Sequence, residues 1–171
     1  LSNEIKQYIK DDDIKVTEFE FNEHKEFIQT TLALAEDVWK KELGRWKWKD
    51  AKLVLYQDKI QSPCGLGSNE IGPFYCPADQ TVYLDLDFFG QISGSLKVKG
   101  DAAEAYVVYH EIGHHVQYLT GELYKQYRNM NKAPNEKRKN QFSVELELQA
   151  DCYAGMVFHH TQYTLEEGDI A

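Results

Sequence analysis

The stretch HEIGHHVQ, residues 110 to 117, has the spacing of a metal-binding helix. His110 and His114 are four residues apart, so on a helix their imidazoles project from one face and can share a metal ion. Zinc suits such a pair, because neutral imidazoles hold it and an open position keeps a water whose pKa falls to about 7. Glu111 lies beside the pair. We expect it to act as general base, taking the proton of that water as the water attacks a carbonyl.

The third histidine of the stretch has a different expected role. On a helix, His115 points about 100° away from His114, so we expect it to pack or form hydrogen bonds rather than bind metal. The preceding YVVY is apolar, and Gly113 leaves room for a substrate or another helix to approach. The alternative to a metal site is a pair of core histidines next to a surface glutamate.

A third metal ligand is expected in ELQAD, residues 147 to 151. Glu147 and Asp151 are again four residues apart on an expected helix. We expect Glu147 to reach the zinc and Asp151 to accept the far N–H of one ligating histidine, which fixes its tautomer. A carboxylate beside Leu148 and Ala150 is costly to bury unless it is paired or metal-bound. The alternative is a solvated acidic face, for which Glu145 is the better candidate.

Periodicity and turn residues place these motifs in an α+β fold that is mainly helical, with a small sheet beside the active-site helix. Gly44 and Gly121 are expected to end the first and second long helices, and Asp101 to begin the second. We expect long helices at 22–43, 102–119 and 143–160, a short helix at 87–92, and a helical piece after 122. Strands are expected at 51–56 and 81–84. A long loop is expected at 61–80, and a charged linker at 131–140.

Composition favours one globular domain over residues 1 to 171, because 42% hydrophobic content in a chain of this length supports a single core. The net charge of -9 argues against a nucleic-acid partner, which would need clustered Lys and Arg. No apolar run approaches the length of a membrane span. Since the chain begins at Leu1 rather than Met, we expect it to be a fragment of a longer protein.

Cys64 and Cys76 lie close together around a segment rich in Gly and Pro, while Cys152 is far away. A disulfide between the first two would stabilise an extracytoplasmic protein by roughly 3 kcal/mol in the chain-entropy model. The alternative is two free thiols, since three cysteines do not reveal the compartment.

Four blocks follow one another in an order that resembles the putative neutral zinc metallopeptidases of bacteria. These blocks are GPFYCPADQTVYLD (72–85), HEIGHHVQ (110–117), ELQADCYAG (147–155) and EGD (167–169). The resemblance implies a zincin-like fold and a peptidase, an endopeptidase by expectation, that uses one zinc ion on peptide or protein substrates. It also implies that His110, His114 and Glu147 are the zinc ligands and that Glu111 is the catalytic base.

The resemblance also implies a substrate-binding strand beside the cleft, made of Thr81, Val82, Tyr83 and Leu84, along which a peptide could pair. Members of the family usually carry an N-terminal membrane anchor, which implies an extracytoplasmic, membrane-anchored full-length protein. They also continue beyond the Glu-Gly-Asp block. A donor for the oxyanion would come from that further segment or from candidates in this chain, which are Tyr153, His159 and His160.

Two alternatives remain at the level of the sequence. A deformylase-like zinc amidohydrolase would also use His-Glu-x-x-His, with Cys64 as its third ligand. That interpretation leaves ELQAD unexplained. The other alternative is a catalytically silent, zinc-bound scaffold.

Overall fold

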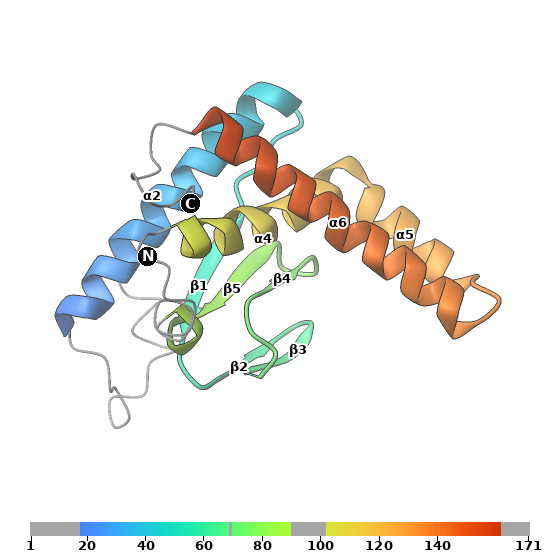
Figure 1. The fold of residues 1–171 in the computed structure, drawn as a ribbon, viewed down its shortest axis with the longest axis horizontal. Coiled ribbons are helices and arrows are strands. Elements are labelled where there is room, and N and C mark those ends of the chain that lie inside the picture. The colour runs from blue at the N-terminus through green and yellow to red at the C-terminus, as the bar shows by residue number, and fades with distance from the viewer. Residues whose placement is uncertain (1–17, 69, 90–101, 162–171) are drawn as a thin grey trace.

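The computed structural model describes residues 18–68, 70–89 and 102–161 (Figure 1). The fold is mixed and mainly helical with a small sheet, as predicted. The helices are α2 (Glu18–Leu43), α4 (Ala102–Thr120), α5 (Glu122–Asn131) and α6 (Glu136–His160), and the strands are β1 (Lys52–Tyr56), β2 (Lys59–Ser62), β3 (Gly65–Ser68), β4 (Phe74–Cys76) and β5 (Thr81–Asp85).

Strand β5 is the centre of a three-stranded sheet with the order β1-β5-β4. It pairs with β1 in parallel, with Lys52 opposite Thr81, and with β4 antiparallel, with Phe74 opposite Tyr83. All five residues of β5 are buried. Strands β2 and β3 form a separate two-stranded antiparallel sheet.

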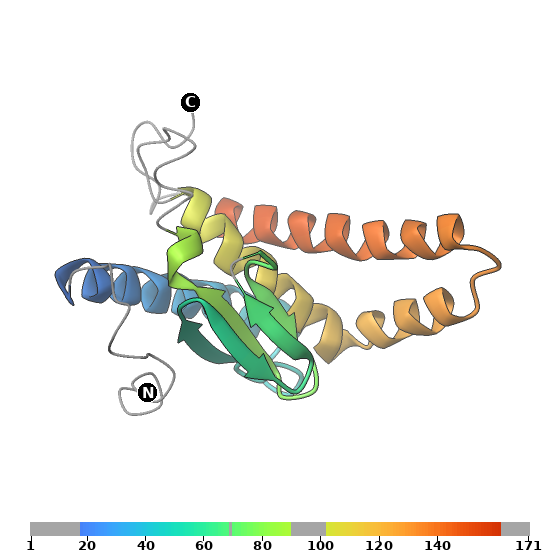
Figure 2. The same cartoon turned by 90° about the horizontal axis from the view of Figure 1, so that it is seen from below.

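Helix α4 lies at the centre of the molecule, where it packs against α2, α6 and β4. Val108, Ile112 and Val116 lie in its buried face, because residues three or four apart share one side of a helix. Figures 1 and 2 show α5 and α6 side by side, as a pair that extends beyond the sheet. The core therefore surrounds α4, and the helix that carries HEIGHHVQ is held from several sides.

Helices α4 and α6 lie very close together at Gly113 of α4. A Cβ atom at this position would lie 3.1 Å from both the Cα and the carbonyl oxygen of Ala150 in α6. A side chain here would push the helices apart, since the facing atoms belong to the backbone of another helix. The contact places the 147–151 segment of α6 directly across from His110.

The predicted loop at 61–80 is wrong, because it contains β3, β4 and the end of β2. Cys64 and Cys76 form a disulfide with an S–S distance of 2.02 Å, which ties the β2–β3 sheet to β4. Gly67 lies in β3 at a position with no room for a side chain, because a Cβ there would lie 2.6 Å from the Phe74 ring. Strands of three or four residues are too short for an alternating pattern to be recognised.

The predicted charged linker at 131–140 is too long, because α5 continues to Asn131 and α6 already begins at Glu136. Its N-cap is Asn135, whose side chain accepts a hydrogen bond from the backbone N–H of Arg138 at 2.9 Å. Charged residues suit an exposed helix as well as a linker, so composition misled the prediction.

The first helix begins at Glu18, ahead of the predicted residue 22, and ends at Leu43 before Gly44. Gly121, with φ of 82°, separates α4 from α5 as predicted. The short helix is present at 86–89, and residues 90–92 of that prediction lie outside the described residues. Asp101 and the Glu-Gly-Asp block lie outside them as well. No helix in the described ranges is long and apolar enough to cross a membrane.

Candidate metal centre

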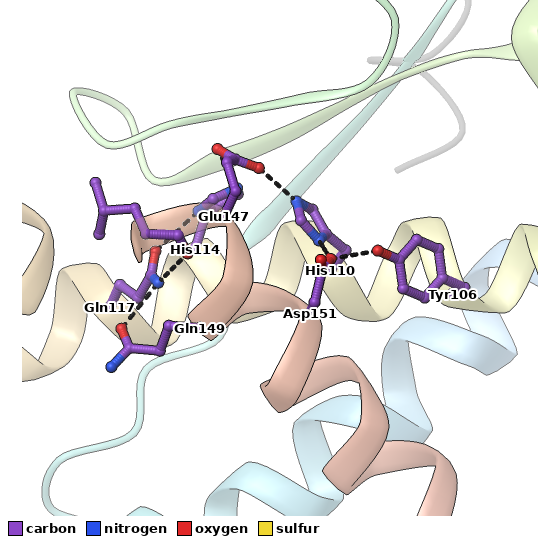
Figure 3. A network of polar contacts seen from close by, with 8 residues as sticks. Tyr106, His110, His114, Gln117, Glu147, Gln149 and Asp151 are labelled. Carbon is purple, nitrogen blue, oxygen red and sulfur yellow. Dashed lines mark hydrogen bonds and ion pairs between the residues drawn. The ribbon is translucent and has the colours of Figure 1, made fainter. Parts of the chain in front are cut away.

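Three side chains from two helices bring ligand atoms to one point where α4 crosses α6 (Figure 3). The Nε2 atom of His110 lies 3.1 Å from one carboxylate oxygen of Glu147, and Nε2 of His114 lies 3.5 Å from the other. Zinc ligands about 2.1 Å from a tetrahedral ion lie about 3.4 Å from one another. The donor set therefore suits zinc, and both of these distances are close to that spacing.

The far nitrogen of each imidazole is occupied by a hydrogen-bond acceptor. Asp151 Oδ1 accepts from Nδ1 of His110 at 2.8 Å, and Gln117 Oε1 accepts from Nδ1 of His114 at 2.8 Å. Each Nδ1 consequently carries the proton of a neutral imidazole, which leaves the lone pair on Nε2. Both lone pairs are thus available on the side where Glu147 lies.

Two of the residues that support the histidines were missed by the sequence analysis. The side-chain nitrogen of Gln117 donates to the Leu146 carbonyl at 2.8 Å and to Gln149 Oε1 at 2.9 Å. These two bonds hold the amide of Gln117 in place. Tyr106 donates its hydroxyl proton to Asp151. A signal existed, because Tyr106 lies one helical turn before His110 and Gln117 one turn after His114. Their roles depend on partners in α6, which the spacing alone does not reveal.

The charges of the centre are strongly coupled. Hydrogen bonds from His110 and His114 hold the pKa of Glu147 well below its usual range. Burial works to lower the pKa of His114, but the bond to Glu147 and the charge of Glu111 outweigh it and raise that pKa to about 8. The pKa of His110 is also raised, against the effect of burial, by Glu147, Glu111 and Asp151. Without metal, both histidines therefore hold a proton to a higher pH than an ordinary imidazole does.

Glu111 is 6% exposed and lines the cleft together with the three ligands. Desolvation raises its pKa, although the neighbouring histidines oppose the change. The cleft measures about 330 Å³ and is lined by Pro73, Phe74, Tyr75, His110, Glu111, His114, Leu123, Tyr127, Met130, Ser143, Leu146 and Glu147. A buried carboxylate next to a metal-ligand set, in an accessible cleft, is the arrangement that a general base needs.

His115 has no part in the ligand set and is fully buried. Its Nε2–H donates to the backbone carbonyl of Lys49 at 2.6 Å, so Nδ1 is the acceptor for the hydroxyl of Tyr75, also at 2.6 Å. Burial lowers the pKa of His115, which keeps the ring neutral. The packing and hydrogen-bonding role predicted for this residue is confirmed.

The predicted substrate strand, Thr81 to Leu84, is wrong. These residues belong to β5, whose two edges are occupied by β1 and β4, and all of their side chains are buried. A peptide cannot add to a strand that is already paired on both sides. The cleft is bordered instead by Pro73 to Tyr75, which include the start of β4.

The candidate oxyanion donors do not line the cleft. The ring of Tyr153 packs edge-on against Trp39, with ring centroids 5.0 Å apart. His159 and His160 are exposed in the last turn of α6, where His160 Nε2 lies 3.6 Å from a carboxylate oxygen of Glu42. Their places in the fold suit packing and surface contacts.

The Cys64 alternative lacks a usable ligand in this fold. Its sulfur is bonded to Cys76, and it is therefore not a thiolate that could bind zinc. The described side chains that could jointly hold a metal are His110, His114 and Glu147. The geometry thus favours the glutamate over the cysteine as third ligand.

Comparison with known proteins identifies the family of the chain. Residues 5–171 match the family described as "Putative neutral zinc metallopeptidase". The chain belongs to this family. One relative is Uncharacterized protein YpfJ of Escherichia coli K12, which is 40% identical over 153 residues, covering 87% of this chain and 53% of the relative.

Another relative is Uncharacterized protein Rv2575 of Mycobacterium tuberculosis H37Rv, 40% identical over 114 residues, which cover 66% of this chain and 37% of the relative. The chain thus spans about half the length of YpfJ, and less of Rv2575. No solved structure gives a significant match.

Proposed function

We propose that the protein is a zinc-dependent peptidase, with one zinc ion held by His110, His114 and Glu147 and with Glu111 as general base. The observation that carries the proposal is the convergence of two Nε2 atoms and a carboxylate, with both Nδ1 atoms engaged by acceptors. Membership of a zinc metallopeptidase family supports the same conclusion.

A zinc ion in this site would lower the pKa of water to about 7 and polarise the carbonyl of a peptide bond. Glu111 accepts a proton from the attacking water and passes it to the leaving amine. The raised pKa of its buried carboxylate suits both steps, since a base with a pKa nearer to neutral also returns the proton readily. Asp151 and Gln117 keep the two imidazoles oriented throughout.

We further propose that the substrate main chain lies along β4. This strand is paired with β5 on one side only, and residues 73–75 form one wall of the cleft. An extended peptide can add to such an edge through main-chain hydrogen bonds. Such pairing recognises the main chain of the substrate and does not require the substrate's N- or C-terminus. It therefore favours an endopeptidase.

The test is cleavage of a mixed peptide library by the zinc-loaded full-length gene product, analysed by mass spectrometry. Glu111→Gln removes the base and keeps the shape of the side chain, so we expect cleavage to fall by about 100- to 10,000-fold. Zinc content should stay at one ion per chain. A chelator should abolish cleavage in the wild type, and added zinc should restore it.

Cleavage that survives Glu111→Gln at the wild-type rate would contradict the assignment of the base. A zinc-loaded wild-type protein that cleaves no peptide would instead favour the catalytically silent scaffold. Zinc content in Glu147→Ala and Cys64→Ser provides a separate check on the third ligand. Loss of zinc in the cysteine variant alone would overturn the ligand set.

A further inference from the structure

Helix α5 presents a row of apolar side chains to the cleft. Leu123, Tyr127 and Met130 are spaced by four and three residues, so they lie on one face of the helix, and all three line the cleft. Leu146 of α6 lines it as well. Leu123 and Leu146 are only 3% and 5% exposed, which makes them the floor of the cleft rather than its rim.

The cleft is poor in charge away from the metal-ligand set. Apart from those ligands and Glu111, the described residues that line it carry no charged side chain. The hydroxyl of Tyr75 is engaged with His115. The charged residues of α5 lie elsewhere, as shown by Lys125, which is exposed and forms an ion pair with Glu122 at 3.1 Å.

These walls discriminate between side chains of a ligand. An apolar side chain that enters the cleft buries its surface against Leu123, Met130 and Leu146, at about 25 cal/mol for each Å². A charged side chain would lose its hydration without gaining a partner. The walls come from helices packed on the core, so the subsite is formed before a ligand arrives.

We propose that the cleft contains an apolar subsite, formed by Leu123, Tyr127, Met130 and Leu146, that takes a bulky apolar side chain of a peptide next to the bond that is cleaved. The link to cleavage rests on the proposed peptidase function. The subsite itself rests on the shape and polarity of the cleft. Specificity at this subsite is then set by residues of α5 and α6.

The chain provides its own probe and control, because it contains two methionines. Met130 lines the cleft, whereas Met156 is 37% exposed on α6 and does not line it. With ¹³C-methyl-labelled methionine, NMR can follow both methyl groups during titration with the amides of N-acetyl-leucine, N-acetyl-phenylalanine and N-acetyl-aspartate. This measurement works on the metal-free and the zinc-loaded protein, and it requires no cleavage.

We expect the leucine and phenylalanine amides to shift the Met130 methyl resonance saturably and to leave Met156 unchanged. The aspartate amide should move neither resonance. Equal shifts of both methyl groups, or a response of Met130 to the aspartate amide alone, would overturn the proposal.

A matched pair of variants extends the test to cleavage. Met130→Lys places a charge in the cleft, and Met156→Lys makes the same change on the exposed side of α6. We expect wild type to prefer a leucine peptide over its alanine counterpart by about 10- to 100-fold in kcat/KM, and Met130→Lys to lose most of that preference. Met156→Lys should keep it. The near-isosteric Met130→Gln serves if the lysine variant does not fold.

The two proposals can fail separately. A saturable shift of Met130 in a protein that cleaves no peptide overturns the peptidase function and keeps the subsite. Cleavage without any preference between the leucine and alanine peptides overturns the subsite and keeps the peptidase function.

Discussion

His110 and His114 are suited to bind metal because each Nδ1, the ring nitrogen that faces away from Glu147, is engaged by a hydrogen-bond acceptor. Asp151 and Gln117 fix which nitrogen carries the proton, and each of these residues is itself held by a further hydrogen bond. Such outer contacts orient the ring and raise the basicity of the nitrogen that faces the metal. The affinity of the centre should therefore respond to substitutions that leave all three ligands in place.

Asp151→Ala and Gln117→Ala should each weaken zinc binding by about 10- to 100-fold, because each releases one imidazole from its fixed tautomer. Competition with a chromophoric chelator measures the affinity. Gln149→Ala is the matched control, since Gln149 is bonded to Gln117 but contacts neither histidine ring in the hydrogen-bond network. Unchanged affinity in both variants would show that these bonds do not support the centre.

Zinc binding should weaken as the pH falls. The pKa of His114 is raised to about 8 in the metal-free protein and that of His110 is raised too, so below this pH zinc has to displace bound protons. The apparent affinity should drop by about tenfold per pH unit for each proton released, and level off above about pH 8. Chelator competition across this range gives the slope. A flat profile from about pH 6 upward would contradict the raised pKa values.

At the scale of elements, the crossing of α4 and α6 determines where Glu147 lies. The two helices approach through Gly113 and Ala150, and this contact fixes the position of Glu147 relative to His110 and His114. The prediction of both helices succeeded because their motifs sit in long periodic segments. The failures at 61–80 and 131–140 fall where strands are too short, or charges too dense, for periodicity to decide.

Gly113→Ala should separate the helices, because the new Cβ would meet backbone atoms of Ala150 at 3.1 Å and these cannot rotate away. Overpacking of this kind costs about 1–3 kcal/mol of unfolding free energy, and zinc affinity should fall as Glu147 moves. Gly155→Ala is the control in the same pair of helices, with nothing within 4 Å of its Cβ. It should be neutral or up to about 1 kcal/mol more stable.

Urea unfolding and chelator competition measure the two effects. If Gly113→Ala matched Gly155→Ala in both measurements, the close approach would not position the metal centre.

For the whole molecule, His115 joins parts that are distant in the sequence. From the buried face of α4, it bonds to the backbone carbonyl of Lys49, ahead of β1, and to the hydroxyl of Tyr75 on β4. The ring of Trp48 packs edge-on against it, with centroids 5.4 Å apart. His115 therefore supports the sheet against α4, whereas its neighbour His114 faces the cleft.

His115→Ala should destabilise the fold by about 2–4 kcal/mol, since it leaves a cavity and removes the hydrogen-bond partner of the Lys49 carbonyl and of the Tyr75 hydroxyl. The folded fraction should still bind one zinc ion, because the ligands remain. Thermal unfolding and zinc content together distinguish this outcome from that of His114→Ala, which should lose zinc with the smaller change in stability. Loss of zinc from well-folded His115→Ala would contradict the structural role.

The sequence by itself predicted the two histidine donors and the candidate base, because His110, Glu111 and His114 share a helix and helical geometry fixes their relation. It also pointed to Glu147 and Asp151 as a second helical pair. The tertiary structure decided how the pairs meet, which amide supports His114, and which strand borders the cleft. These depend on the packing of segments far apart in the chain, and β5 has no free edge for a peptide because two other strands occupy both of its edges.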